Sequence, residues 1–155
     1  MAQLALVGGI FLLALLAGFV PFISIEVALL LSAATHGSTR VLLALAIAAA
    51  LGMMVGKCFF FVGGRRAFAW RERRGGKKRF HLPAFVSRAT KRPPVAAATV
   101  FVSAATGLPP FAVVSPLAGS WRLRLSSFFM VGFAGKMTRF AGIVLVPGLL
   151  TAIHP

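Results

Sequence analysis

The chain has few of the acidic and polar residues with which a water-soluble protein covers its surface. Only Glu26 and Glu72 are acidic among 155 residues, 12% of residues are charged, and tyrosine is absent. Hydrophobic residues make up 59% of the chain, against roughly 45–50% in average soluble domains. Too little polar surface remains to cover a globule of this size. The composition therefore excludes a soluble enzyme and indicates an integral membrane protein.

Cysteine and histidine are also scarce. The single cysteine, Cys58, excludes an internal disulfide, and the three histidines stand isolated, so no zinc-binding spacing occurs. We therefore expect no metal and no cofactor, and we find no set of residues suited to enzyme chemistry. The first twenty residues lack the basic start of a secretory signal peptide. We interpret Leu4–Val20 as a retained apolar helix.

Positive charge is abundant and concentrated. Lysine and arginine total 17, which gives a net charge of +15. A basic block over Arg65–Arg92, lying between apolar stretches, fits the positive-inside rule for cytoplasmic loops better than a nucleic-acid site. Aromatic residues such as Phe68 and Trp70 interrupt the block, which is typical of a segment on an anionic membrane surface. The candidate lipid-surface residues are Arg71, Arg73, Arg74, Lys77, Lys78 and Arg79.

The apolar stretches repeat one plan, a broken stretch followed by a longer one. Adjacent prolines block helix continuation, so Val95–Gly119, with Pro109 and Pro110 at its centre, is expected to form a re-entrant hairpin. Leu4–Ala34 is interrupted by Pro21, and for it a kinked span and a hairpin both stay open. The residues expected to shape these breaks are Pro21, Gly107, Pro109 and Pro110.

The longer stretches are Val41–Gly64 and Leu125–Ile153. Within the first, Gly52 and Gly56 form a G-x-x-x-G pattern, which favours close approach of another helix. Only two short residue matches link the two copies, Pro21-Phe22 against Pro110-Phe111 and Gly56-Lys57 against Gly135-Lys136.

This plan predicts the fold class and the domain organisation. We expect an all-α integral membrane protein with two inverted repeats, each a re-entrant helical hairpin followed by a transmembrane helix. The whole of 1–155 forms one membrane domain, with repeat 1 at 1–64, a basic cytoplasmic segment at 65–94 and repeat 2 at 95–153. Inverted repeats built on broken helices are the plan of secondary transporters, whose sites lie near the membrane midplane.

Glu26 is the strongest candidate site residue, because it lies in an apolar arm five residues after Pro21. A charged side chain at the centre of a membrane helix costs about 2.5–3.5 kcal/mol on insertion scales. Its role is either proton coupling or headgroup binding, or an ion pair that only locks helices together, or a position at an exposed helix end. The candidate partners are Lys57, Lys136 and Arg139.

The three cations differ in their expected roles. Lys136 and Arg139 are three residues apart and share a helix face, where they would bind a phosphate or pair with the acid. Lys57 has the alternative of extending its amine to the membrane surface. Hydroxyls at Ser103, Thr106 and Ser115 would either line a cavity or bond their own backbone.

Several of these segments resemble the DedA family, also called the VTT or SNARE-associated Golgi protein domain. Pro21-Phe-Ile-Ser-Ile-Glu26 resembles the tip of that family's first hairpin, and Leu51-Gly-Met-Met-Val-Gly56 its glycine-patterned helix. Thr106-Gly-Leu-Pro-Pro-Phe111 resembles part of its second hairpin. The chain looks like a short, divergent member, since Ser103 and Pro109 to Phe111 stand where bacterial members carry arginines.

The resemblance implies movement of undecaprenyl phosphate or other phospholipids across the bacterial inner membrane, as a translocase or a scramblase, with proton coupling in some members of the family. We expect anionic lipid headgroups as partners, and we do not expect nucleic acid. Two other functions stay open, a proton-coupled transporter of small solutes and a membrane interaction protein without transport. The sequence leaves open the cargo, the coupling ion and the oligomeric state, with a homodimer as one option.

Overall fold

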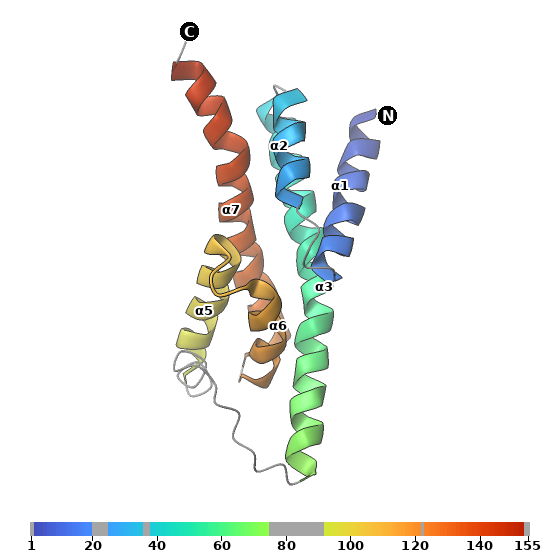
Figure 1. The fold of residues 1–155 in the computed structure, drawn as a ribbon, viewed down its shortest axis with the longest axis vertical. Coiled ribbons are helices and arrows are strands. Elements are labelled where there is room, and N and C mark those ends of the chain that lie inside the picture. Colours follow the sequence, from blue (N-terminus) through green and yellow to red (C-terminus); the bar gives the residue numbers. More distant parts are fainter. Residues whose placement is uncertain (1, 20–24, 36–37, 75–91, 122, 154–155) are drawn as a thin grey trace. The chain divides into compact units, whose positions relative to one another are not determined.

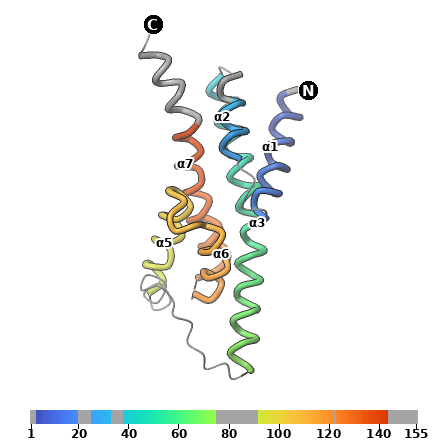
Figure 2. The backbone as a smooth tube through the Cα atoms, in the orientation of Figure 1, coloured from blue at the N-terminus to red at the C-terminus, as the bar shows by residue number. Residues whose placement is uncertain are grey.

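The computed structural model describes residues 2–19, 25–35, 38–74, 92–121 and 123–153. Within them every regular element is an α-helix, which confirms the all-helical part of the predicted fold class (Figure 1). Figure 2 follows the same path through the Cα atoms. The helices are α1 (Ala2–Phe19), α2 (Ile25–Thr35), α3 (Thr39–Arg73), α5 (Pro93–Thr106), α6 (Phe111–Ser120) and α7 (Leu125–Ile153).

Helix α3 is long and apolar enough to cross a membrane, with a mean hydropathy of 2.2 over its most apolar window of 18 residues. It is the one helix of that kind found in the described part of the chain. The helix continues to Arg73, although the apolar stretch ends at Gly64. The added turns are rich in arginine, and positive charge near a helix C-terminus interacts favourably with the helix dipole.

The second broken stretch folds as a helical hairpin. Helix α5 ends at Thr106 because Gly107 takes up the left-handed conformation, with φ of 81°, a common way for helices to end. Pro109 and Pro110 then separate α5 from α6. The two helices pack together and run in opposite directions (Figure 1).

The first broken stretch also forms two packed helices. Helices α1 and α2 contact each other and run in opposite directions (Figure 1). Pro21, which was expected to shape this break, lies outside the described residues. The two arms are therefore two helices rather than one continuous helix.

The chain divides into two compact units. Unit 1 comprises Met1–Gly56 and Lys136–Pro155, and unit 2 comprises Lys57–Gly135. Unit 1 contains the hairpin α1–α2, and unit 2 contains the hairpin α5–α6, each with parts of α3 and α7. The division does not follow the sequence order of the expected repeats, because both long helices contribute to both units.

In unit 1, the glycines of α3 allow α1 to approach closely. A Cβ at Gly52 would overlap the carbonyl oxygen of Phe11 and lie 3.1 Å from the Cβ of Ala14. A Cβ at Gly56 would lie 2.9 Å from the Cα of Gly18. The close approach expected from the G-x-x-x-G pattern is therefore present.

Unit 2 contains a matching contact between α5 and α7. A Cβ at Gly135 would lie 2.7 Å from the carbonyl oxygen of Phe101 and 2.8 Å from the Cβ of Ala104. Gly52 meets the same atom types in the same order, a phenylalanine carbonyl and the alanine Cβ three residues later. The sequence comparison had aligned Gly135 with Gly56. The contacts in the structure instead match Gly135 with Gly52.

Aromatic rings fill the rest of the core of unit 2. Phe128 stacks on Phe61 and Phe111, with ring centroids 4.6 Å and 6.0 Å apart. Helix α6 also lies against the backbone of α3, because a Cβ at Gly119 or Gly64 would overlap backbone atoms of the other helix. These contacts hold the second hairpin in place within its unit.

Candidate functional site

Glu26 lies in the first turn of α2. Its neighbours Ile25 and Leu29 are buried, and they fix the orientation of the helix within unit 1. A carboxylate in the first turn is stabilised by the positive end of the helix dipole, typically by about 0.3–1 kcal/mol. The side chain of Glu26 keeps about a third of its surface exposed, at 35%.

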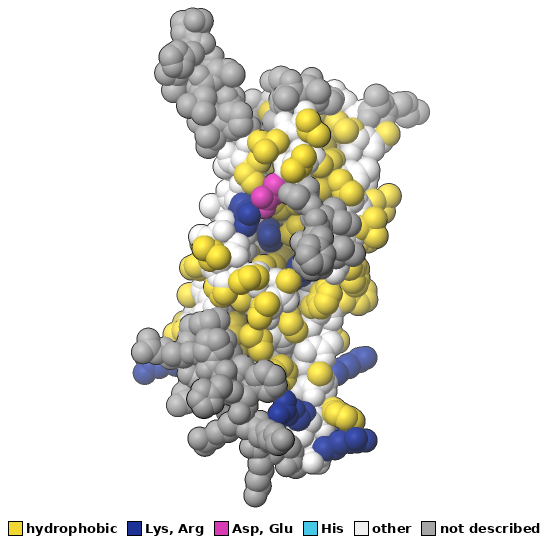
Figure 3. All heavy atoms as spheres, viewed as in Figure 1, with side chains coloured by type: hydrophobic (Ala, Val, Ile, Leu, Met, Phe, Trp, Pro, Cys, Tyr) yellow, Lys and Arg dark blue, Asp and Glu magenta, His cyan; other side chains and the backbone are white. Residues whose placement is uncertain are grey.

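Arg139 of α7 forms an ion pair with this carboxylate. The Nη2 atom of Arg139 lies 2.5 Å from Oε1 of Glu26, and the arginine side chain is 26% exposed. A hydrogen bond between two charged groups is roughly twice as strong as a neutral one. On the face shown in Figure 3, an acidic side chain touches basic ones among hydrophobic side chains. Of the three candidate cations, the structure pairs Arg139 with Glu26.

Lys136 lies one turn before Arg139 on the same helix and is buried, with 6% exposed. Its Nζ atom is 5.6 Å from the centroid of the Phe140 ring, within range of a cation–π interaction. Helix α7 therefore brings two cations one turn apart to unit 1, against the single acid Glu26 with which Arg139 pairs. Because the only other acidic side chain of the whole sequence, Glu72, belongs to unit 2, no second carboxylate side chain of unit 1 can balance this excess.

Lys57 belongs to unit 2 and is 4% exposed. Its Nζ atom lies 5.1 Å from the centroid of the Phe60 ring, so the ammonium contacts an aromatic face of its own helix. The structure places this lysine in the interior of its unit.

The hydroxyls of the second hairpin bond to backbone carbonyls. Ser103 Oγ donates to the carbonyl of Pro109 at 2.5 Å, and Ser115 Oγ donates to that of Phe111 at 2.5 Å. Thr106 Oγ1 donates to the carbonyl of Val102 at 2.7 Å and accepts from the Leu108 N–H at 3.1 Å. The bonds to the Pro109 carbonyl and from the Leu108 N–H satisfy backbone groups at the break between the helices, whereas Thr106 to Val102 and Ser115 to Phe111 are bonds within a helix to the carbonyl four residues earlier. They shape the hairpin together with Gly107.

The candidate lipid-surface residues divide at the end of α3. Arg71 and Arg73 belong to its last turn, and Arg74 follows it. The guanidinium of Arg74 stacks over the Trp70 ring, 4.0 Å from the centroid. Lys77, Lys78 and Arg79 lie outside the described residues.

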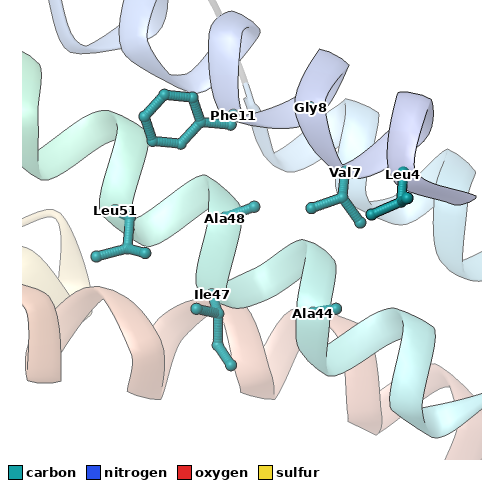
Figure 4. A pocket seen from close by; sticks show the side chains of 8 residues that line it. All are labelled: Leu4, Val7, Gly8, Phe11, Ala44, Ile47, Ala48 and Leu51. Carbon is teal, nitrogen blue, oxygen red and sulfur yellow. The ribbon is translucent and has the colours of Figure 1, made fainter.

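An apolar groove between α1 and α3 was not predicted from the sequence. It has a volume of about 550 Å³, and side chains from both helices line it (Figure 4). The paired glycines Gly8-Gly9 are the one sequence signal for it, since Gly8 leaves its side open. The lining residues are Leu4, Val7, Gly8, Phe11, Ala44, Ile47, Ala48 and Leu51. None of them supplies an ionisable or nucleophilic group.

The described residues contain no group of three or more histidine, cysteine or acidic side chains that would hold a metal ion. Comparison with known proteins found no matching family model, no matching curated protein and no matching solved structure. The charged cluster of Glu26, Lys136 and Arg139 is thus the candidate site that the chemistry of the described residues favours.

Proposed function

We propose that this protein is a membrane transporter that translocates or scrambles a lipid or lipid-linked phosphate across the bacterial inner membrane. The observation that carries the proposal is the Glu26–Arg139 ion pair with Lys136 one turn away. Ionisable residues inside a membrane region are expensive and mark functional pathways by default. The apolar composition and the length of α3 support the membrane setting.

The charge balance of the site favours an anionic cargo. Two cations and one carboxylate leave an excess positive charge for a phosphate oxygen to bind. Arginine binds phosphate in a bidentate geometry, as it binds a carboxylate. A phosphate headgroup can therefore take the place of Glu26 at Arg139.

This exchange of partners gives the proposed transport step. When the phosphate pairs with Arg139, Glu26 loses its cation and takes up a proton instead. When the phosphate leaves, Glu26 releases the proton and pairs with Arg139 again. The cation is therefore paired in both states, which avoids the penalty of an isolated charge in an apolar setting.

A reconstitution experiment tests the proposal. The protein is inserted into vesicles that carry a fluorescent phospholipid in both leaflets, and dithionite is added outside. We expect the fluorescence to fall beyond the half that protein-free vesicles lose, because inner-leaflet lipid reaches the outside. A loss identical to that of protein-free vesicles, with the protein folded and inserted, would contradict lipid translocation.

A further inference from the structure

Helix α3 changes character abruptly after its apolar part. From Arg65 onward it carries arginines with a single acid, Glu72, and the side chains of Phe68 and Trp70 are 36% and 57% exposed. The arginines of this basic extension, which we define as Arg65–Arg74, are Arg65, Arg66, Arg71, Arg73 and Arg74. All of them except the half-buried Arg71 are exposed.

The length of α3 places this extension outside a hydrocarbon layer. Thr39–Gly64 is 26 residues, or about 39 Å of helix at about 1.5 Å per residue. A typical hydrocarbon core is only about 30 Å thick. If the apolar part of α3 crosses the membrane, the extension therefore begins in the headgroup layer.

Another element of unit 2, α6, ends beside the start of the extension and is followed in the chain by a further arginine. A Cβ at Gly119 of α6 would lie 2.7 Å from the backbone nitrogen of Arg65, so α6 ends alongside that residue. Arg124 follows shortly and is exposed. Exposed aromatic rings among these cations suit the boundary between acyl chains and headgroups.

We propose that the basic extension of α3 binds the anionic headgroups of phospholipids at one membrane surface, as a site separate from Glu26 and Arg139. Charge complementarity identifies the partner, because each arginine near an anionic leaflet adds attraction while the aromatic rings insert beside it. The inference rests on the membrane placement in the proposed function but not on transport.

The two tryptophans of the chain, Trp70 and Trp121, make a direct test possible. Trp121 is buried, and its indole N–H makes no hydrogen bond in the described structure, so Trp121→Phe leaves Trp70 as the single reporter. The full-length variant is reconstituted into phosphatidylcholine vesicles containing a fixed fraction of phosphatidylglycerol. Bromine atoms placed near the headgroup of one lipid or of the other quench tryptophan fluorescence on contact.

We expect brominated phosphatidylglycerol to quench Trp70 more strongly than brominated phosphatidylcholine at the same mole fraction. High salt should reduce the difference, because salt screens exposed charges. In the double variant Arg66→Gln/Arg73→Gln, the two brominated lipids should quench Trp70 equally. The matched variant Arg66→Lys/Arg73→Lys keeps the charge and should keep the preference. These substitutions leave Arg74 stacked on the reporter ring.

Three outcomes would overturn the inference. Equal quenching by both lipids in the Trp121→Phe protein would show that the extension lies at the surface without binding anionic lipid, and would leave transport untouched. A preference that persists in the double glutamine variant would show that these arginines do not produce it. Quenching by neither lipid would place Trp70 away from the membrane and would also contradict the membrane placement in the proposed function.

Discussion

At the scale of single residues, the Glu26–Arg139 pair determines what a substitution at either position does. Glu26→Gln leaves Arg139 without its partner, and Arg139→Gln leaves the carboxylate alone. Breaking a fully buried pair costs about 3–5 kcal/mol, but both side chains are partly exposed, so we expect roughly 1–3 kcal/mol for each variant. The variant with both glutamines should regain part of that loss. Thermal unfolding of the wild type, the two single variants and the double variant in detergent measures this coupling. A double variant that loses the full sum of the two single losses would contradict it.

Ser103 is expected to stabilise the turn of the second hairpin. Its hydroxyl is buried and donates to the carbonyl of Pro109, so Ser103→Ala leaves that acceptor unsatisfied. We expect a loss of about 1–3 kcal/mol in the free energy of unfolding. Ser126→Ala is the control because Ser126 is exposed on α7. Equal unfolding temperatures for the two variants would show that the hydroxyl does not hold the turn.

Much of the candidate site could be predicted from single residues, but the pairing could not. Glu26 is conspicuous as the one acid in an apolar stretch, and its three candidate cations follow from the sequence. The choice of Arg139 depends on how α2 and α7 pack within unit 1. No local pattern encodes that packing, because the two helices are separated by about a hundred residues.

At the scale of elements, the matching contacts at Gly52 and Gly135 predict matching effects of substitution. Alanine is the better helix former by about 0.8–1 kcal/mol, so an open glycine position gains stability when it becomes alanine. Gly52→Ala and Gly135→Ala instead place a methyl group against a phenylalanine carbonyl. We expect each to lose roughly 1–3 kcal/mol, as overpacked sites do.

Gly63→Ala and Gly142→Ala are the controls, because a Cβ there meets nothing within 4 Å. Unfolding temperatures of the four single variants measure the contrast. If Gly52→Ala were damaging and Gly135→Ala neutral, the two helix contacts would not be equivalent, and the case for a repeated unit would fail.

Element boundaries show where the sequence pattern is informative. The apolar stretch Leu125–Ile153 coincides with α7, and the prolines at 109 and 110 correctly predict the break between α5 and α6. The end of α3 was predicted too early, because hydropathy falls at Arg65 while the helix continues through Gly63 and Gly64 to Arg73. Arginine is a good helix former, so the arginines that follow Gly64 are compatible with a longer helix.

At the scale of the whole molecule, the proposed membrane placement predicts the side on which each helix end lies. In a Cys58→Ala background, Ser38→Cys and Arg74→Cys mark the two ends of α3. We expect an impermeant thiol reagent outside intact cells to label the first and not the second, because basic segments stay in the cytoplasm. Ser120→Cys, at the end of the second hairpin, should behave like Arg74→Cys. Labelling of both ends of α3 from outside would contradict a crossing helix.

Lipid translocation by Glu26→Gln tests whether Glu26 takes part in transport. The amide nearly keeps the shape of the carboxylate but can neither pair with Arg139 as an anion nor exchange a proton. The dithionite assay is run on wild type and variant in the same vesicles, with rates divided by the amount of folded protein. We predict that the variant, once folded and inserted, translocates no faster than protein-free vesicles. Translocation by the folded variant at the wild-type rate would show that Glu26 takes no part in transport.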